Sequence, residues 1–280
     1  MNHLTAKLIE SFLAEDLSHG DVTTDSLPLA WQQTRWQASI IARTACVVSG
    51  LGIAKGVFTQ VDPTLQCVAF RSDADRVLAD EALMQINGTA ASILKAERTA
   101  LNLLQHLCGI ATSTQAFVQA IEGTGAIIAH TRKTTPGLRS LELQAVIDGG
   151  GRLHRTDLGQ AAMLKDNHLA LANGNVALAV QAVRQRLSHM AKLCVEADTF
   201  LQVQQALDAG ADVILLDNMS PQQVRQAVAL IDGRATVEVS GGITLHNVRA
   251  YAEAGAQVIS TSQITLGAPS VDLGLDVETP

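Results

Sequence analysis

Residues 192–218 read KLCVEADTFLQVQQALDAGADVILLDN. Two apolar runs flank a segment whose apolar residues recur at helical spacing, and the runs carry Glu196 and Asp217 at or near their ends. Short apolar runs on either side of a helical pattern are typical of parallel strands that are buried on both faces. The stretch therefore predicts a strand–helix–strand unit with a carboxylate at the end of each strand.

The same alternation continues on both sides of this unit. Four more apolar runs end in polar residues, namely AIIAHTRK (126–133), AAMLKDNH (161–168), TVEVSGG (236–242) and QVISTS (257–262). Helical patterns occupy 140–148, 175–189, 199–210, 220–232 and 244–255. Six such strands with functional groups at their carboxyl ends indicate an α/β barrel. Because a complete barrel has eight strands, either two strands are cryptic or the barrel is short or open.

The part before residue 125 has a different texture. Residues 5–17 form an amphipathic pattern, and β-branched runs between about 33 and 90 predict an antiparallel sheet. From about residue 91 the apolar spacing becomes helical over a long span, and Gly109 is expected to divide it into two helices. These features predict an N-terminal α/β unit that a bridging helical segment joins to the barrel.

Composition excludes several classes of protein. The chain has 280 residues, of which 47% are apolar, and a formal net charge of −7, so neither nucleic acid nor an anionic membrane is expected as a partner. The four cysteines form no C-x-x-C pair, which argues against a disulfide framework and a zinc site. We find no signal peptide and no apolar stretch long enough to span a membrane, and we therefore expect a cytoplasmic protein.

Basic residues gather at the predicted strand ends. Arg132 and Lys133 follow the first barrel strand, His154 and Arg155 follow a triple glycine, and Lys165 ends the next strand. A solvated loop face would explain any one pair. If the barrel forms, however, all of them meet at one mouth, and several cations in an acidic chain predict an anionic ligand with carboxylate or phosphate groups.

Acidic and glycine-rich segments complete the predicted mouth. Glu196 and Asp217 would suit ribose hydroxyls or a magnesium ion held together with phosphates, although either could be a helix cap or a surface charge. Ser240, Gly241 and Gly242 lie between a strand and a helix, where free backbone amides bind phosphate. We expect a phosphate at this late position in the barrel.

Several motifs, taken in order, resemble the quinolinate phosphoribosyltransferase family. They are AEDLSHGDVTT (14–24), AERTALNLLQHLCGIAT (96–112), TRKTTPGLR (131–139), GGG-x-x-HR (149–155), LKDNH (164–168), AGADVILLDN (209–218), VSGGIT (239–244) and APSVDLGLDV (268–277). The resemblance implies an incomplete α/β barrel of six to seven strands with an N-terminal α/β sandwich domain. It implies a sandwich with its bridging helix over 1–111, a barrel over 112–267, and a tail over 268–280 that returns to the sandwich.

The resemblance also implies a reaction and a set of site residues. The reaction joins quinolinate to phosphoribosyl pyrophosphate with Mg²⁺ and yields nicotinate mononucleotide, pyrophosphate and CO₂. The family works as a homodimer or higher even oligomer, in which Arg98 reaches the neighbouring site. The implied quinolinate ligands are Arg98, Arg132, His154, Arg155 and Lys165. The implied phosphoribosyl pyrophosphate ligands are Lys133, Glu196, Asp217, Ser240, Gly241, Gly242 and Ser262. The implied catalytic residues are Lys133, Lys165, Glu196 and Asp217, the last two also holding Mg²⁺, largely through substrate and water.

The chain departs from the family pattern at four places. The family usually has Asn at Leu153, Gly at Asp157 and Glu at Cys194, and Gly-Ala-Leu-Thr-His in place of residues 262–266, SQITL. The last change removes a phosphate-facing glycine and a histidine. Two alternatives therefore remain beside the quinolinate enzyme: a diverged paralogue with another acceptor, of the molybdate-transport-associated type, and a non-catalytic ligand-binding relative.

Overall fold

The chain forms two compact units. The computed structural model describes residues 3–278. The first unit contains the chain up to Ser113, the segment Ser140–Gly149 and the residues from Ala268 onward, and the second contains Thr114–Arg139 and Gly150–Gly267. Each unit has its own sheet, so each has its own core.

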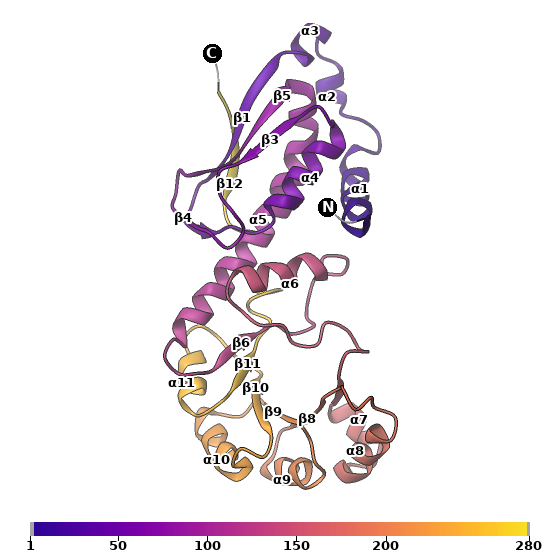
Figure 1. Ribbon diagram of the computed structural model, residues 1–280, viewed down its shortest axis with the longest axis vertical. Coiled ribbons are helices and arrows are strands. Elements are labelled where there is room, and N and C mark those ends of the chain that lie inside the picture. Colours follow the sequence, from indigo (N-terminus) through magenta and orange to yellow (C-terminus); the bar gives the residue numbers. More distant parts are fainter. Residues whose placement is uncertain (1–2, 279–280) are drawn as a thin grey trace. The chain divides into compact units, whose positions relative to one another are not determined.

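The first unit is built on a four-stranded antiparallel sheet, in the order β12-β1-β5-β3. In β1 every second residue from Ala38 to Ala42 is buried, as expected of a sheet with one covered face. Figure 1 shows α4 and α5 lying along this sheet. The predicted antiparallel unit is thus confirmed. Its elements are α1 (His3–Leu17), α2 (Val22–Asp25), α3 (Leu29–Gln32), β1 (Arg35–Ala42), β2 (Cys46–Val47), α4 (Leu51–Val61), β3 (Gln66–Ala69), β4 (Arg76–Val77), β5 (Ala82–Thr89) and β12 (Leu273–Val277).

A single helix, α5 (Ala90–Ala120), occupies the bridging segment, so the predicted break at Gly109 is wrong. A Cβ atom at Gly109 would lie only 2.2 Å from the backbone oxygen of Pro269. The glycine therefore allows the chain that leads into β12 to pass close to the helix, and the long helix pattern tolerates it at a cost of about 1 kcal/mol relative to alanine.

The helix α6 (Arg139–Asp148) belongs to the first unit, although its sequence lies between two barrel segments and the sequence pattern assigns it to the barrel. The fully buried Glu142 is hydrogen-bonded to Nε2 of His106 at 2.8 Å. Ser49 Oγ donates to Asp148 Oδ2 at 2.7 Å. A helical period predicts the helix but does not reveal its packing partner, which here is α5 and the loop before α4.

The second unit is a barrel-like parallel sheet, in the order β6-β11-β10-β9-β8-β7. In the described residues β6 and β7 are not paired with each other, and one further parallel bridge joins Ala129 to Arg152. This arrangement of six strands and a single bridge confirms the incomplete α/β barrel and explains the count of strands in the sequence. The strands are β6 (Ile127–Ala129), β7 (Ala162–Leu164), β8 (Leu193–Ala197), β9 (Val213–Asp217), β10 (Thr236–Ser240) and β11 (Val258–Ser260).

Helices cover the outside of this sheet (Figure 1). Ser220 caps α10 through a reciprocal capping box with Gln223, and Pro221 takes the first helical position. One short helix, α7, was not expected after the LKDNH run. It begins after Lys165, whose backbone amide donates to Nδ1 of His168. The helices are α7 (Asp166–Leu171), α8 (Val176–Arg184), α9 (Phe200–Asp208), α10 (Pro221–Ile231) and α11 (Val248–Glu253).

Candidate active site

A cavity of about 320 Å³ opens at the carboxyl ends of the barrel strands. All of its lining residues belong to the second unit. It brings together most of the predicted site residues, which come from six different strands and loops. These are Arg132, Lys133, His154, Arg155, Lys165, Glu196, Asp217 and Ser240.

Strand register explains why these side chains meet. Parallel pairing sets Ser240 of β10 beside Asp217 of β9. In β8, Glu196 lines the mouth, whereas Cys194, two residues earlier, lines a second cavity that also contains the amino ends of the strands. Residues two apart on a strand share a face, so both side chains point into the barrel, and the one nearer the carboxyl end reaches the mouth.

The basic side of the mouth is formed by two arginines. Nη1 of Arg155 donates to the carbonyl of Ala161 at 3.1 Å, which anchors the half-buried side chain. Burial lowers the pKa of the Arg155 guanidinium, and the neighbouring charge of Arg132 lowers it further. Arg155 remains charged, because an arginine side chain in a protein is effectively always protonated. The two like charges in a partly desolvated place favour an anion between them.

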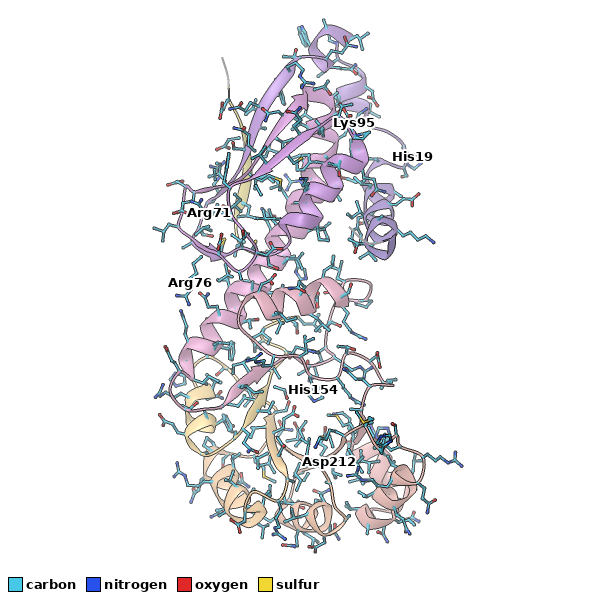
Figure 2. The ribbon with its side chains drawn as sticks, viewed as in Figure 1. His19, Arg71, Arg76, Lys95, His154 and Asp212 are labelled. Carbon is cyan, nitrogen blue, oxygen red and sulfur yellow. The ribbon has the colours of Figure 1, made fainter. Side chains whose placement is uncertain are left out.

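His154 is held from both sides of its ring, and Figure 2 shows it within the space that the barrel strands enclose. The backbone amide of Arg155 donates to Nδ1 of His154 at 2.7 Å. Nε2 lies 3.3 Å from Oε2 of Glu238. The sequence motifs predict a role in the site for His154 but not for Glu238, which is 3% exposed. A charged residue inside the apolar run TVEVS was the signal that could have revealed it.

The acidic side is formed by Glu196 and Asp217. Lys165 Nζ makes an ion pair with Oε2 of Glu196. Asn218 donates from Nδ2 to Oδ2 of Asp217 at 2.7 Å. Burial raises the pKa of the Asp217 carboxyl, and the negative charge of Asp198 raises it further, while Lys165 opposes both effects. A cation bound at Asp217 would compensate this loss of hydration.

The glycines after β10 adopt the left-handed backbone region, with φ of +89° at Gly241 and +62° at Gly242. They form a turn that is closed by Asn247, whose Nδ2 donates to the carbonyl of Gly242 at 2.9 Å. The following helix, α11, starts at Val248, four residues after the helical pattern in the sequence begins at residue 244. The asparagine-closed turn separates the glycines from the helix.

Besides Gly241 and Gly242, which are not among the lining residues, two other predicted residues lie away from the cavity. Ser262 follows β11 in a turn in which its carbonyl accepts from the amide of Gly267 at 3.0 Å. Arg98 is exposed on α5 in the first unit. Neither is among the residues that line the cavity.

Unpaired polar atoms concentrate in this cavity. Among the described residues, four buried side-chain nitrogen or oxygen atoms have no hydrogen-bond partner. Three of them, His130 Nε2, Arg132 Nε and Glu238 Oε1, belong to residues that line the mouth, and the fourth is Thr114 Oγ1. Because buried polar groups are almost always paired, this clustering marks a place where a polar ligand or water completes the structure.

Family models match nearly the whole chain. The N-terminal domain model of quinolinate phosphoribosyl transferase covers residues 21–108, and the C-terminal domain model covers residues 110–276. The chain belongs to the quinolinate phosphoribosyl transferase family. This match confirms the resemblance that the sequence motifs indicate.

Individual relatives agree with the family models. The chain is 39% identical to the "Probable nicotinate-nucleotide pyrophosphorylase [carboxylating]" of Bacillus subtilis (strain 168), over 99% of this chain and 95% of the relative. It is 34% identical to the human nicotinate-nucleotide pyrophosphorylase [carboxylating], over 96% and 90%. A crystal structure of the Ehrlichia chaffeensis nicotinate-nucleotide pyrophosphorylase superposes with a TM-score of 0.93 at 35% identity, covering 99% of each chain.

The described residues of this quinolinate phosphoribosyl transferase family member contain no helix that is long and apolar enough to cross a membrane. They also contain no group of three or more His, Cys, Asp or Glu side chains arranged to hold a metal ion. Glu196 and Asp217 can supply at most a minority of the six oxygen ligands that Mg²⁺ prefers. Any Mg²⁺ at the mouth must therefore take most of its ligands from substrate phosphates and water.

Proposed function

We propose that the cavity at the barrel mouth is where this enzyme joins quinolinate to phosphoribosyl pyrophosphate. The products are nicotinate mononucleotide, pyrophosphate and CO₂. The observation that carries the assignment is a cavity lined by two arginines and two lysines, in which the Arg132 Nε donor is buried without a partner. A planar di-acid offers the acceptors that such a set of donors needs.

The basic side of the mouth would bind quinolinate. The Arg132 and Arg155 guanidinium groups can each form two parallel hydrogen bonds with one carboxylate. Lys165 would contribute a third charge, although it must share it with Glu196. His154 would contact quinolinate with the edge of its ring and would hold the loop that carries it in position.

The acidic side would bind phosphoribosyl pyrophosphate. Glu196 and Asp217 would accept from ribose hydroxyls and share a Mg²⁺ ion that arrives with the pyrophosphate, and that ion would neutralise charge on the leaving group. Lys133, which is exposed at the rim, would contact the pyrophosphate. Ser240, Gly241, Gly242 and Ser262 would hold the 5′-phosphate.

Chemistry at this site rests on positioning and electrostatics. As the bond between the anomeric carbon and pyrophosphate breaks, positive charge grows on the sugar, where the Glu196 and Asp217 carboxylates stabilise it. The quinolinate nitrogen then forms the new bond to that carbon. Loss of CO₂ then leaves an electron pair on the ring carbon beside the positively charged nitrogen. That adjacent positive charge stabilises the pair until a proton binds to the carbon in place of the lost carboxylate. No side-chain nucleophile is required, so alignment of the two substrates supplies much of the acceleration.

The direct test is an assay of the purified protein with quinolinate and phosphoribosyl pyrophosphate, with and without Mg²⁺. We expect CO₂ and nicotinate mononucleotide in equal amounts, only when Mg²⁺ is present. Nicotinate offered in place of quinolinate should give no product. Product from nicotinate alone would indicate a different acceptor, and calorimetric binding of both substrates without turnover would indicate a non-catalytic relative.

We also propose a homodimer in which the exposed Arg98 of one subunit completes the site of the other. Arg98→Ala and Lys165→Ala variants would each be inactive alone. If Arg98 acts across the dimer, mixed dimers of the two variants contain one intact site, and a refolded equal mixture should regain roughly a quarter of the native activity. Recovery of no activity, with heterodimers demonstrated by mass spectrometry, would place Arg98 outside the neighbouring site.

A cytoplasmic location remains a prediction.

A further inference from the structure

Glu238 is a carboxylate in the middle of a buried strand, between Val237 and Val239 of β10. It is 3% exposed, and its Oε1 atom has no hydrogen-bond partner. Burial of a carboxylate with one unpaired oxygen lowers the stability of the fold, so a glutamate at this position indicates a role other than packing. Its position beside the proposed substrate cavity suggests what that purpose is.

The hydrogen bonds of His154 determine where its ring proton lies. The Arg155 amide can only donate, so Nδ1 of His154 must be the unprotonated, accepting nitrogen. The ring proton is therefore on Nε2, which faces Oε2 of Glu238 at 3.3 Å. A doubly protonated ring would set two N–H groups against each other at Nδ1. Both ring nitrogens of His154 therefore face a partner within the protein.

Glu238 and His154 also form part of the wall between two cavities. Both residues, together with Arg155 and Met163, line the mouth as well as a cavity of about 460 Å³ that includes the amino ends of the barrel strands. The negative charge of Glu238 acts on the Arg155 guanidinium and favours its charged form. The carboxylate is therefore linked to Arg155 twice, through space and through the His154 ring.

We propose that Glu238 is a positioning residue for quinolinate binding. Its carboxylate accepts the Nε2 proton of His154, which fixes the ring in one tautomer. The ring in turn holds the backbone of Arg155 through Nδ1 and so aims the guanidinium into the mouth. This role rests on the proposed function of the cavity. It differs from the charge-bearing role that the sequence suggests for His154.

Two variants of Glu238 separate the effect of its hydrogen bond to His154 from the effect of its negative charge. In Glu238→Gln the amide oxygen can still accept the Nε2 proton, and we expect KM for quinolinate to stay within about twofold of the native value. In Glu238→Ala the ring loses its anchor, and KM should rise about tenfold, with kcat at saturating quinolinate nearly unchanged. If the charge itself were needed, Gln and Ala would impair the enzyme alike.

A double-mutant cycle tests whether Glu238 acts through His154. The His154→Ala variant should already show the raised KM, and adding Glu238→Ala should change it no further. Glu142→Ala is the matched control, because Glu142 is also a fully buried glutamate paired with a histidine, His106, but lies in the first unit. It should lower thermal stability without altering KM for quinolinate. Fully additive effects of the His154 and Glu238 changes would overturn the proposal.

A spectroscopic measurement tests the same arrangement without substrate. Long-range ¹H–¹⁵N correlation spectra of histidine-labelled protein, assigned through the loss of one signal in His154→Ala, should show His154 protonated at Nε2 only, in the native protein and in Glu238→Gln. A fully protonated or Nδ1-protonated ring at neutral pH would refute the proposal. Because this readout requires no catalysis, its result stands even if the enzyme does not use quinolinate.

Discussion

Replacement of Arg155 by alanine provides the sharpest test of the basic side of the mouth. One guanidinium nitrogen, Nη1, is committed to the carbonyl of Ala161. The remaining donors are free to face a ligand carboxylate in the cavity. The side chain is already partly dehydrated, since burial is the largest cause of its lowered pKa. Little further desolvation is therefore needed when quinolinate binds.

The expected loss follows from these contacts. A hydrogen bond to a charged group contributes about 1.5–3 kcal/mol, and the ligand carboxylate would lose one or two such bonds. The variant should therefore bind quinolinate about 2–4 kcal/mol more weakly, which is roughly a 30- to 1,000-fold higher Kd. Arg155→Lys should fall between the two, because an ammonium group restores the charge but not the paired geometry.

Isothermal titration of quinolinate into the purified variants measures this loss directly. Arg152→Ala is the control, since Arg152 is an exposed arginine on the same loop that does not line the cavity. It should bind quinolinate with native affinity. A Kd for Arg155→Ala within about twofold of the native value, in a protein with native circular dichroism, would refute the assignment of Arg155 to the site.

Three further changes test other parts of the structure. Gly241→Ala places a Cβ atom 2.3 Å from Oδ1 of Asn218, at a residue whose φ is +89°. The displaced turn should raise KM for phosphoribosyl pyrophosphate about tenfold in initial-rate assays. An unchanged KM would show that this turn does not bind the phosphate. Gly109→Ala places a Cβ atom against the backbone oxygen of Pro269 and should lower the free energy of unfolding, measured in urea, by about 2 kcal/mol. An unchanged free energy of unfolding would show that the two segments can move apart without cost. Asp217→Asn should lower kcat about a hundredfold and raise the thermal midpoint at pH 7. The folded state raises the pKa of Asp217, so its ionised form destabilises the fold, and this penalty disappears as the pH falls below that pKa. The gain in thermal midpoint should therefore shrink as the pH is lowered. A gain that does not change with pH would show that the charge of Asp217 is not its cause.

The barrel strands could be predicted from the sequence because parallel strands that are buried on both faces leave an unmistakable apolar run. Their order could be predicted only through the family, since nothing in the run of Ile127–Ala129 says that it pairs with β11 rather than with β7. Helix ends with a side-chain cap, such as Ser220, were predictable from local chemistry. The continuity of α5 could not be predicted in this way, because it depends on a backbone contact between Gly109 and Pro269, which are far apart in sequence.

The candidate site shows the same division. Polar residues at strand ends, such as Lys165 and Asp217, could be predicted because strand direction alone delivers them to one edge. Glu238 could not, since a carboxylate inside a strand becomes meaningful only when its neighbour across the barrel interior is known. Residue type alone marks His154 as a basic group, whereas the amide and the carboxylate that face its two ring nitrogens are known only from the folded chain.

The pairing of β12 with β1 has a consequence for biosynthesis. β1 lies near the start of the chain, yet one of its two neighbours in the sheet leaves the ribosome only after every barrel strand has been made. Throughout that interval β1 presents an open edge with unsatisfied amides, the kind of surface that invites pairing with other nascent chains. The domain that is begun first is therefore completed last, and it is during translation that this protein should be most prone to aggregate.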